Sequence, residues 1–236
     1  MTPHQLRSRL DRVRNQFGFG EELRQDDIHQ VLAQFPELPP MAESLLIVNP
    51  DGSPTDAHLL ADRRLCHLFG WRHRCPQIFL LTQDATKLII QIRSEDKDEA
   101  PGKLDLTVGG HVKGGHGDPE EFRTAAVEEM SEELGLRESD IEGGALISIG
   151  QSVATYNIET HDNPLFDIHN AEVRRIYHGV LAHGAFDRVH FADGEIAALQ
   201  LVGLAEAWSL LERDDIASGL RFCLPIYLAW LHGHVR

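Results

Sequence analysis

The stretch Gly109–Leu136 constrains the fold most, because it predicts one short helix whose last two turns are crowded with carboxylates. The four acidic residues are Glu128, Glu129, Glu132 and Glu133. At about 100° per residue, their side chains fall within an arc of about 140°. Like charges at this spacing cost about 0.2–0.5 kcal/mol per pair, and the helix dipole disfavours negative charge at the C-terminal end. The pattern therefore indicates a compensating cation, and a hard divalent ion completed by phosphate oxygens of a substrate fits it.

The alternative interpretation is a solvated acidic helix face, which explains less of the segment. Only Arg137 is spaced to neutralise any of the four glutamates through the helix. Asp118 is predicted to cap the helix with Pro119 at its first position, and Gly135 is typical of the residue after the last turn. The apolar stripe consists of Ala126, Val127, Met130 and Leu134.

This segment resembles the signature of the Nudix hydrolases, which spaces glycines and glutamates along a loop and a helix. The residues that fit are Gly114, Glu120, Glu129, Met130, Glu132, Glu133, Gly135 and Leu136. Glu128 stands where the family has arginine. A second alignment starts the signature at Gly109–Gly110–His111–Val112 and makes the following loop longer than usual. Both alignments keep the second half of the signature in place.

Flanking blocks resemble the Nudix branch that includes isopentenyl diphosphate isomerase and its hydrolase relatives, over about residues 43–212. In order, these blocks are His73-Arg74, CPQIFLLTQ, KLIIQIRS, Lys97, Pro101-Gly102 and LDLTVGGHV. The isomerase has a catalytic cysteine just before the Gly-His pair, and Gly109 occupies that position here. The resemblance therefore implies a hydrolase, with the isomerase as the least favoured reading.

The resemblance also implies the residues of an active site. Mg²⁺ or Mn²⁺ would be held by Glu129, Glu132 and Glu133, with Glu128 as a further ligand or an exposed replacement for arginine. Glu129 or Glu132 could instead act on the attacking water, and Glu172 and Glu195 are further candidates for the general base. Arg93 and Lys97 match diphosphate-binding positions, although a solvated pair at a strand end is the alternative. Gly110 and His111 are assigned to substrate binding with them.

The isomerases bind a metal through several histidines and a pair of glutamates. His67, His73 and His111 fall at or near the matching positions, with His67 one residue off. Glu172 matches one glutamate, and Asn170 stands in place of the other. This second set is incomplete, and each histidine taken alone is more often structural or exposed than a ligand.

The order of predicted elements indicates an α/β fold, a Nudix-type α/β/α sandwich with a mixed sheet over residues 41–236. We expect helices over 2–17, from about Glu21 or Asp26 to Phe35 (ending before Pro39-Pro40), 204–211 and 215–232. Strands are expected near 43–47, 77–82, 87–93, 104–108, 145–154, 172–182 and 199–202. Residues 1–40 form a helical extension that could cap the domain, form a homodimer surface or shape substrate access. The polar segment 155–170 is expected to be a long loop, either a lid or a surface excursion.

Composition limits the function. A net charge of −15 argues against a nucleic-acid polymer as partner, because such binding depends on neutralising phosphates. The chain has no apolar run near the roughly 20 residues of a membrane span, and its N-terminus lacks the apolar core of a signal peptide. Three cysteines without metal or disulfide spacing favour a reducing, cytoplasmic compartment.

We therefore expect a Mg²⁺- or Mn²⁺-dependent hydrolase that cleaves a nucleoside diphosphate linked to another moiety, or a related small diphosphate. The alternative is a catalytically weak Nudix-fold protein that binds or senses a ligand, which Glu128 and the irregular loop suggest.

Overall fold

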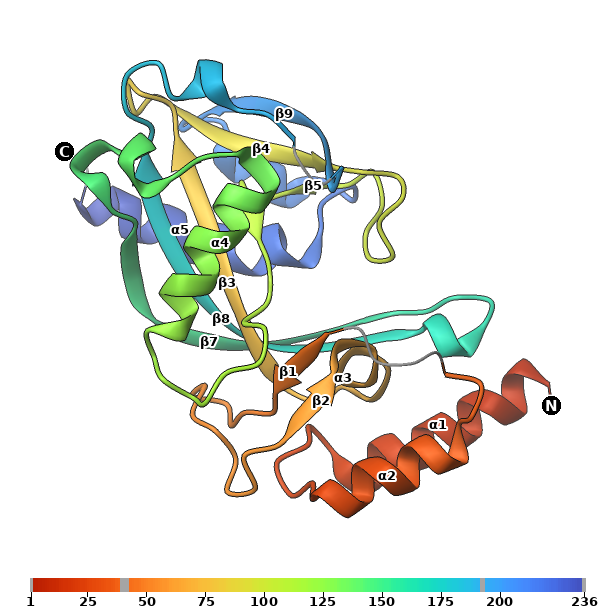
Figure 1. The fold of residues 1–236 in the computed structure, drawn as a ribbon. Helices are drawn as coiled ribbons and strands as arrows, with labels where there is room; N and C mark the ends of the chain where they lie inside the picture. The colour runs from red at the N-terminus through yellow and green to blue at the C-terminus, as the bar shows by residue number, and fades with distance from the viewer. Residues whose placement is uncertain (1, 39–42, 192–193, 235–236) are drawn as a thin grey trace. The chain divides into compact units, whose positions relative to one another are not determined.

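The computed structural model describes residues 2–38, 43–191 and 194–234, and the chain divides into two compact units (Figure 1). Unit 1 comprises Met1–Cys75, His111–Glu121 and Ser152–Arg174, and unit 2 comprises Pro76–Gly110, Phe122–Gln151 and Arg175–Arg236. Pro39-Pro40, which should end the second helix, and the predicted boundary at residue 40 lie outside the described residues. The division into an extension and a domain stays a prediction.

Unit 1 starts with two helices that the sequence predicts. Helix α1 spans Pro3–Phe17 and helix α2 spans Gln25–Gln34. The Thr2 hydroxyl accepts a hydrogen bond from the Gln5 amide at 3.2 Å, and the Thr2 amide donates to the Gln5 side chain at 2.9 Å. This reciprocal cap, with Pro3 at the first helical position, confirms the predicted start of α1.

Two short strands and a helix complete this part of unit 1. Strands β1 (Ser44–Leu46) and β2 (Leu60–Asp62) pair antiparallel, and helix α3 spans Arg63–Phe69. The sequence did not predict α3, because seven residues are too few to display a helical period. The Asp62 carboxylate caps α3 by accepting from the Arg64 amide at 2.8 Å. The five elements share one core, which includes Leu10, Val31, Phe35, Leu45, Ala61, Phe69 and Trp71.

A seven-stranded sheet has the order β5-β4-β3-β8-β7, with β6 pairing β3 and β9 pairing β4. The strands are β3 (His73–Leu81), β4 (Lys87–Arg93), β5 (Leu104–Asp105), β6 (Val108–Gly109), β7 (Ile147–Glu159), β8 (Ile168–Val180) and β9 (Ile196–Gly203). The predicted hairpin of β3 and β4 is confirmed, with Leu80 opposite Ile89. The single strand expected over 104–108 is instead split, because the Asp105 carboxylate accepts from the Leu106 amide at 2.9 Å and breaks the ladder.

The long loop expected over 155–170 is wrong at both of its ends. Strand β7 runs to Glu159 and β8 starts at Ile168, so only residues 160–167 connect the strands, and they contain the 3₁₀ helix η3 (Pro164–Phe166). The Asp167 carboxylate closes this turn by accepting from the His161 amide at 2.8 Å. Arg7 of α1 also pairs with Asp167, at 3.1 Å. Thr155, Tyr156 and Ile158 are β-branched or aromatic residues, which favour a strand.

Two helices of unit 2 lie on opposite faces of its strands (Figure 1). Helix α4 spans Glu121–Leu134 and helix α5 spans Ser218–His234. Tyr227 of α5 stacks on Phe79 of β3, with ring centroids 4.3 Å apart, in an apolar core. The helix expected over 204–211 is the 3₁₀ helix η5 (Ala207–Glu212), and the other short 3₁₀ helices are η1 (Glu138–Asp140), η2 (Glu142–Gly144) and η4 (Phe186–Arg188).

The predicted α/β class, with a multi-stranded sheet and helices on both faces in unit 2, is confirmed. Among the described residues, the helices are too short or too polar to span a membrane.

Candidate functional site

The C-terminal end of α4 lies where the sequence predicts it, whereas the N-terminal end does not. The helix starts at Glu121 rather than Pro119, because Asp118 caps a turn that precedes it: its carboxylate accepts from the Glu120 amide at 2.9 Å. At the C-terminal end, Gly135 has a φ of 66°, its amide bonds to Ser131, and the next amide reaches back to Met130 at 3.3 Å. The predicted glycine stop is confirmed.

The four glutamates of α4 divide into two kinds. Glu129 and Glu133 are buried, with 8% and 2% of their surfaces exposed, whereas Glu128 and Glu132 are exposed. Residues four apart lie on one helix face, so Glu129 and Glu133 form a buried pair one turn apart. We call Glu129 and Glu133 the acidic face. Carboxylate oxygens in this arrangement are the ligands that Mg²⁺ and Mn²⁺ prefer.

A glycine approaches the acidic face closely. A β-carbon added to Gly110 would lie 2.1 Å from the carboxyl carbon of Glu129. By contrast, no atom lies within 4 Å of a β-carbon built on Gly114. A side chain at position 110 would therefore displace the Glu129 carboxyl, whereas Gly114 is suited to glycine by its φ of 64°.

The long loop before α4 is held by a buried arginine that sequence reasoning did not single out. Arg74 donates to the carbonyls of Gly52 (2.7 Å), Gly117 (2.7 Å) and Asp118 (3.0 Å). Its guanidinium also pairs with Glu121 at 3.1 Å. Because Glu121 accepts from the Gly117 amide as well, the loop is fixed at both the arginine and the start of α4. The Gly117-Asp118 sequence gave no sign of this role.

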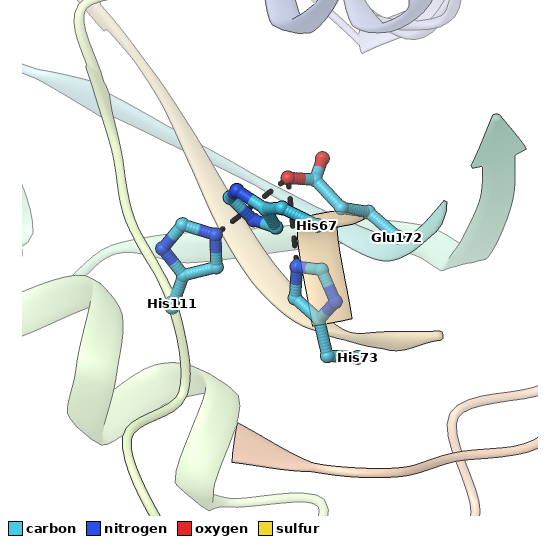
Figure 2. Close-up of side chains that lie close together, drawn as sticks. All are labelled: His67, His73, His111 and Glu172. Carbon is cyan, nitrogen blue, oxygen red and sulfur yellow. Dashed lines mark ion pairs between the residues drawn. The ribbon is translucent and has the colours of Figure 1, made fainter. Parts of the chain in front are cut away.

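In unit 1, three histidines and one glutamate converge in a buried group that we call the histidine centre. Its members are His67 of α3, His73 of β3, His111 of the glycine-rich loop and Glu172 of β8 (Figure 2). One ligand atom from each lies within 4.8 Å of every other. The three ring centroids are 5.1, 5.1 and 5.3 Å apart, so the imidazoles form a nearly regular triangle.

Two of the histidines, His67 and His73, present neutral nitrogens to this group. The Nδ1 atom of His73 lies 3.0 Å from the carbonyl oxygen of Trp71. A carbonyl only accepts, so the proton sits on Nδ1 and the Nε2 lone pair faces the centre. Burial lowers the pKa of His73 despite the opposing effect of Glu172, and burial with the charges of His73 and Arg63 holds the pKa of His67 well below its ordinary value. Neutral imidazole is the form that binds metal ions.

Glu172 is held by partners on both of its oxygens. Oε1 lies 3.9 Å from His73 Nε2 and 3.8 Å from His111 Nε2, and it accepts from the Asn170 amide at 2.9 Å. Oε2 pairs with Arg174 at 2.6 Å. Burial opposes the ionisation of Glu172, but the charge of Arg174 and the Asn170 hydrogen bond outweigh it and lower the pKa of Glu172. Asn170, which stands where the isomerases have a glutamate, therefore supports Glu172.

The histidine centre fits a divalent ion that prefers nitrogen. The Nε2 atoms of His67 and His73 are buried without a hydrogen-bond partner among the described residues. A four-coordinate ion with bonds of about 2.1 Å needs its ligand atoms about 3.5 Å apart, so a small inward movement of the side chains would close the site. The sequence placed these histidines near matching positions but could not complete the set, because His67 lies on the unpredicted helix α3.

The remaining predicted site residues, Arg93, Lys97 and Glu195, lie in unit 2, and of these Lys97 and Glu195 contact each other. Arg93 donates to the Glu99 carbonyl at 2.8 Å and pairs with Asp105 at 3.2 Å. Lys97 forms an ion pair with Glu195. Their roles in diphosphate binding and proton transfer stay predictions.

The chain has relatives among known proteins. No protein-family model matches it. Nudix hydrolase 3 of Arabidopsis thaliana is 32% identical over 71 residues, which is 30% of this chain and 9% of that protein. An uncharacterized Nudix hydrolase of Yersinia pestis is 42% identical over 65 residues, which is 28% of this chain and 33% of that protein. The matched segments thus span only a third or less of either relative.

A solved structure has a similar fold. DR0079 from Deinococcus radiodurans aligns with a TM-score of 0.51 and 18% identity, covering 78% of this chain and 98% of that protein.

Proposed function

We propose that the chain belongs to the Nudix superfamily, as its similarity to segments of two Nudix hydrolases supports, and that it is a divalent-metal-dependent hydrolase. Its substrate would be a nucleoside diphosphate linked to another group, or a related small diphosphate. The observation that carries the proposal is the acidic face: two buried carboxylates one turn apart, with Gly110 against one of them. Carboxylates buried near the C-terminal end of a helix favour a cation, since the helix dipole adds to their negative potential.

The glutamates of α4 would have different roles in the reaction. Glu129 and Glu133 would hold Mg²⁺ or Mn²⁺, and Glu132, exposed beside them, would accept a proton from the attacking water. The bound ion supplies charge neutralisation at the leaving phosphate and a lowered pKa for water. Glu128 is exposed and would contribute at most a weak outer ligand. Gly109 carries no thiol, which argues against isomerase chemistry.

We further propose that the histidine centre binds a second ion of a different class. Three neutral imidazoles with one carboxylate suit zinc and similar transition-metal ions better than Mg²⁺. His111 and Glu172 would then be metal ligands, rather than a substrate-binding residue and a general base.

The test is hydrolysis of a substrate panel with Mg²⁺ or Mn²⁺, using nucleotide sugars, dinucleotides and nucleoside triphosphates. Glu133→Gln removes a buried carboxylate charge with little change in shape, and we expect kcat to fall by about 100-fold or more. The matched control is Glu128→Gln on the exposed side of the same helix, which should retain most activity. Absence of turnover on every substrate, or equal activity of the Glu133→Gln variant and the wild type, would contradict the proposal.

A further inference from the structure

A buried arginine contacts the glutamate of the histidine centre. Arg174 has 1% of its surface exposed, and its Nη2 atom lies 2.6 Å from Glu172 Oε2. Its Nε atom donates to the Thr155 hydroxyl at 2.8 Å. Thr155 lies on β7 and the other two residues lie on β8, so two strands fix the guanidinium from different sides.

The arginine divides the two oxygens of Glu172. Oε2 is taken by the guanidinium, whereas Oε1 faces the imidazole nitrogens of His73 and His111. A carboxylate can bind an ion through one oxygen or through both. Held in this way, Glu172 offers one oxygen, and the centre provides three nitrogens and one oxygen.

The arginine also balances the charge of the centre. The negative charge of Glu172 lies beside the positive charge of Arg174, whose Nη2 atom is 2.6 Å from Oε2. Hard ions such as Mg²⁺ and Mn²⁺ depend on carboxylate oxygens and their charge, whereas zinc binds neutral imidazoles well. Asn170 contributes no further charge.

We propose that Arg174 is a positioning residue that sets the metal selectivity of the histidine centre. By holding Glu172 as a one-oxygen ligand, it makes the centre favour four-coordinate zinc-like ions over Mn²⁺ and Mg²⁺. The inference rests on the proposed histidine metal centre and does not depend on hydrolysis at the acidic face.

The first experiment measures Zn²⁺ and Mn²⁺ binding to the full chain by competition with a chelator. A His73→Ala variant identifies which binding events belong to the histidine centre. For Arg174→Met we expect Zn²⁺ affinity to fall by about 10–100-fold, the usual effect of losing a partner of a metal ligand. Mn²⁺ affinity should hold or rise, so the zinc-to-manganese ratio falls at least about tenfold. Arg174→Lys keeps the charge without the planar guanidinium and should restore part of the ratio.

A Co²⁺ spectrum separates this role from a merely structural one. Bound to the wild-type centre, Co²⁺ should give the intense visible bands of a four-coordinate ion. In Arg174→Met, the freed oxygen of Glu172 should raise the coordination number and weaken these bands. A structural defect would lower the affinity for all ions together and leave the spectrum of the bound ion unchanged.

The outcomes are distinct. If Arg174→Met leaves the zinc-to-manganese affinity ratio and the Co²⁺ spectrum unchanged, the role of Arg174 is overturned. If the His73→Ala variant binds as many ions as the wild type, the histidine centre itself is overturned. Failure of Mg²⁺-dependent hydrolysis would affect neither result. If Arg174→Met does not fold, because a buried carboxylate has lost its partner, Thr155→Val decides. This variant keeps the ion pair between Arg174 and Glu172 but removes the Thr155 hydroxyl that accepts from Nε. It should lower the zinc-to-manganese affinity ratio by a smaller factor than Arg174→Met, and an unchanged ratio would overturn the inference.

Discussion

The acidic face and the histidine centre differ in how the chain assembles them. The acidic face comes from one helix, where residues four apart necessarily share a side. The histidine centre comes from α3, β3, the glycine-rich loop and β8, which lie far apart in the sequence. A site built on one helix can therefore be read from spacing, whereas a site built from four segments requires the fold.

The two regions also differ in ligand chemistry. The acidic face offers two buried carboxylates, and the histidine centre offers three buried imidazoles with one carboxylate that is paired with Arg174. Oxygen-rich and nitrogen-rich sites select different ions. A single chain with both would hold two metals of different classes, and the following changes should affect the two regions unequally.

The largest expected effect is on the loop that leads from the histidine centre to α4. Arg74→Met removes a buried cation with several carbonyl partners and Glu121, and we expect a loss of about 3 kcal/mol in unfolding free energy. Because the Arg74 carbonyl accepts from the Val112 amide at 3.1 Å, the segment beside His111 should loosen and Zn²⁺ affinity should fall. Urea unfolding and zinc competition measure both effects.

The matched control is Arg213→Met, which breaks the exposed pair with Asp215 in unit 2. It should change stability little, because exposed ion pairs contribute little. Equal stability of the Arg74→Met and Arg213→Met variants would show that Arg74 does not fix the loop.

An intermediate effect is expected at the acidic face. Gly110→Ala places a β-carbon against the carboxyl of Glu129, and overpacking of this kind costs about 1–3 kcal/mol. Displacing a metal ligand by about 1 Å can also cost about 100-fold in rate. We expect Mg²⁺-dependent turnover to fall much more than zinc affinity.

Gly109→Ala is the neighbouring control, since its added β-carbon meets the flexible end of Gln77 at 3.2 Å. It should be tolerated better than Gly110→Ala. If Gly109→Ala and Gly110→Ala reduce Mg²⁺-dependent turnover equally, the close approach of Gly110 to Glu129 does not matter for activity.

The smallest expected effect is on the stability of the fold at acidic pH, and it involves a residue outside both the acidic face and the histidine centre. Burial lowers the pKa of His178, whose Nδ1 atom lies 2.9 Å from the Tyr227 hydroxyl, with the Trp230 ring beside it. The unfolded chain then binds the proton more readily, with a pKa of about 6.5. The stability from neutral His178 is full above about pH 6.5 and is lost as the pH falls toward the lowered pKa.

His178→Gln should therefore lose less unfolding free energy than the wild type between about pH 7 and about pH 5. His4→Gln, on the exposed side of α1, should follow the wild type. Parallel curves of unfolding free energy against pH for the wild type and His178→Gln would refute the role of His178. The acid sensitivity would then be attributed to the metal ligands.

Sequence predicted those parts of the fold that depend on local pattern. The cap at Thr2, the glycine stop at Gly135 and the β3–β4 hairpin follow from residues close together in the chain. It did not predict α3, which is too short to show a helical period, or the extension of β7 and β8 into the two ends of the polar segment 155–170. There, pairing between strands and the Asp167 turn outweighed polar composition.

The candidate sites show the same limit. Spacing placed the four glutamates on one helix but treated them alike, because burial of Glu129 and Glu133 depends on what packs against α4. The roles of Arg74 and Arg174 could not be predicted, since their partners lie in other segments.

Anomalous X-ray diffraction at the zinc and manganese edges, from one crystal equilibrated with both ions, tests the central claim most directly. We expect zinc among His67, His73, His111 and Glu172, and manganese beside Glu129 and Glu133. The same ion in both places, or no ion at either, would contradict it.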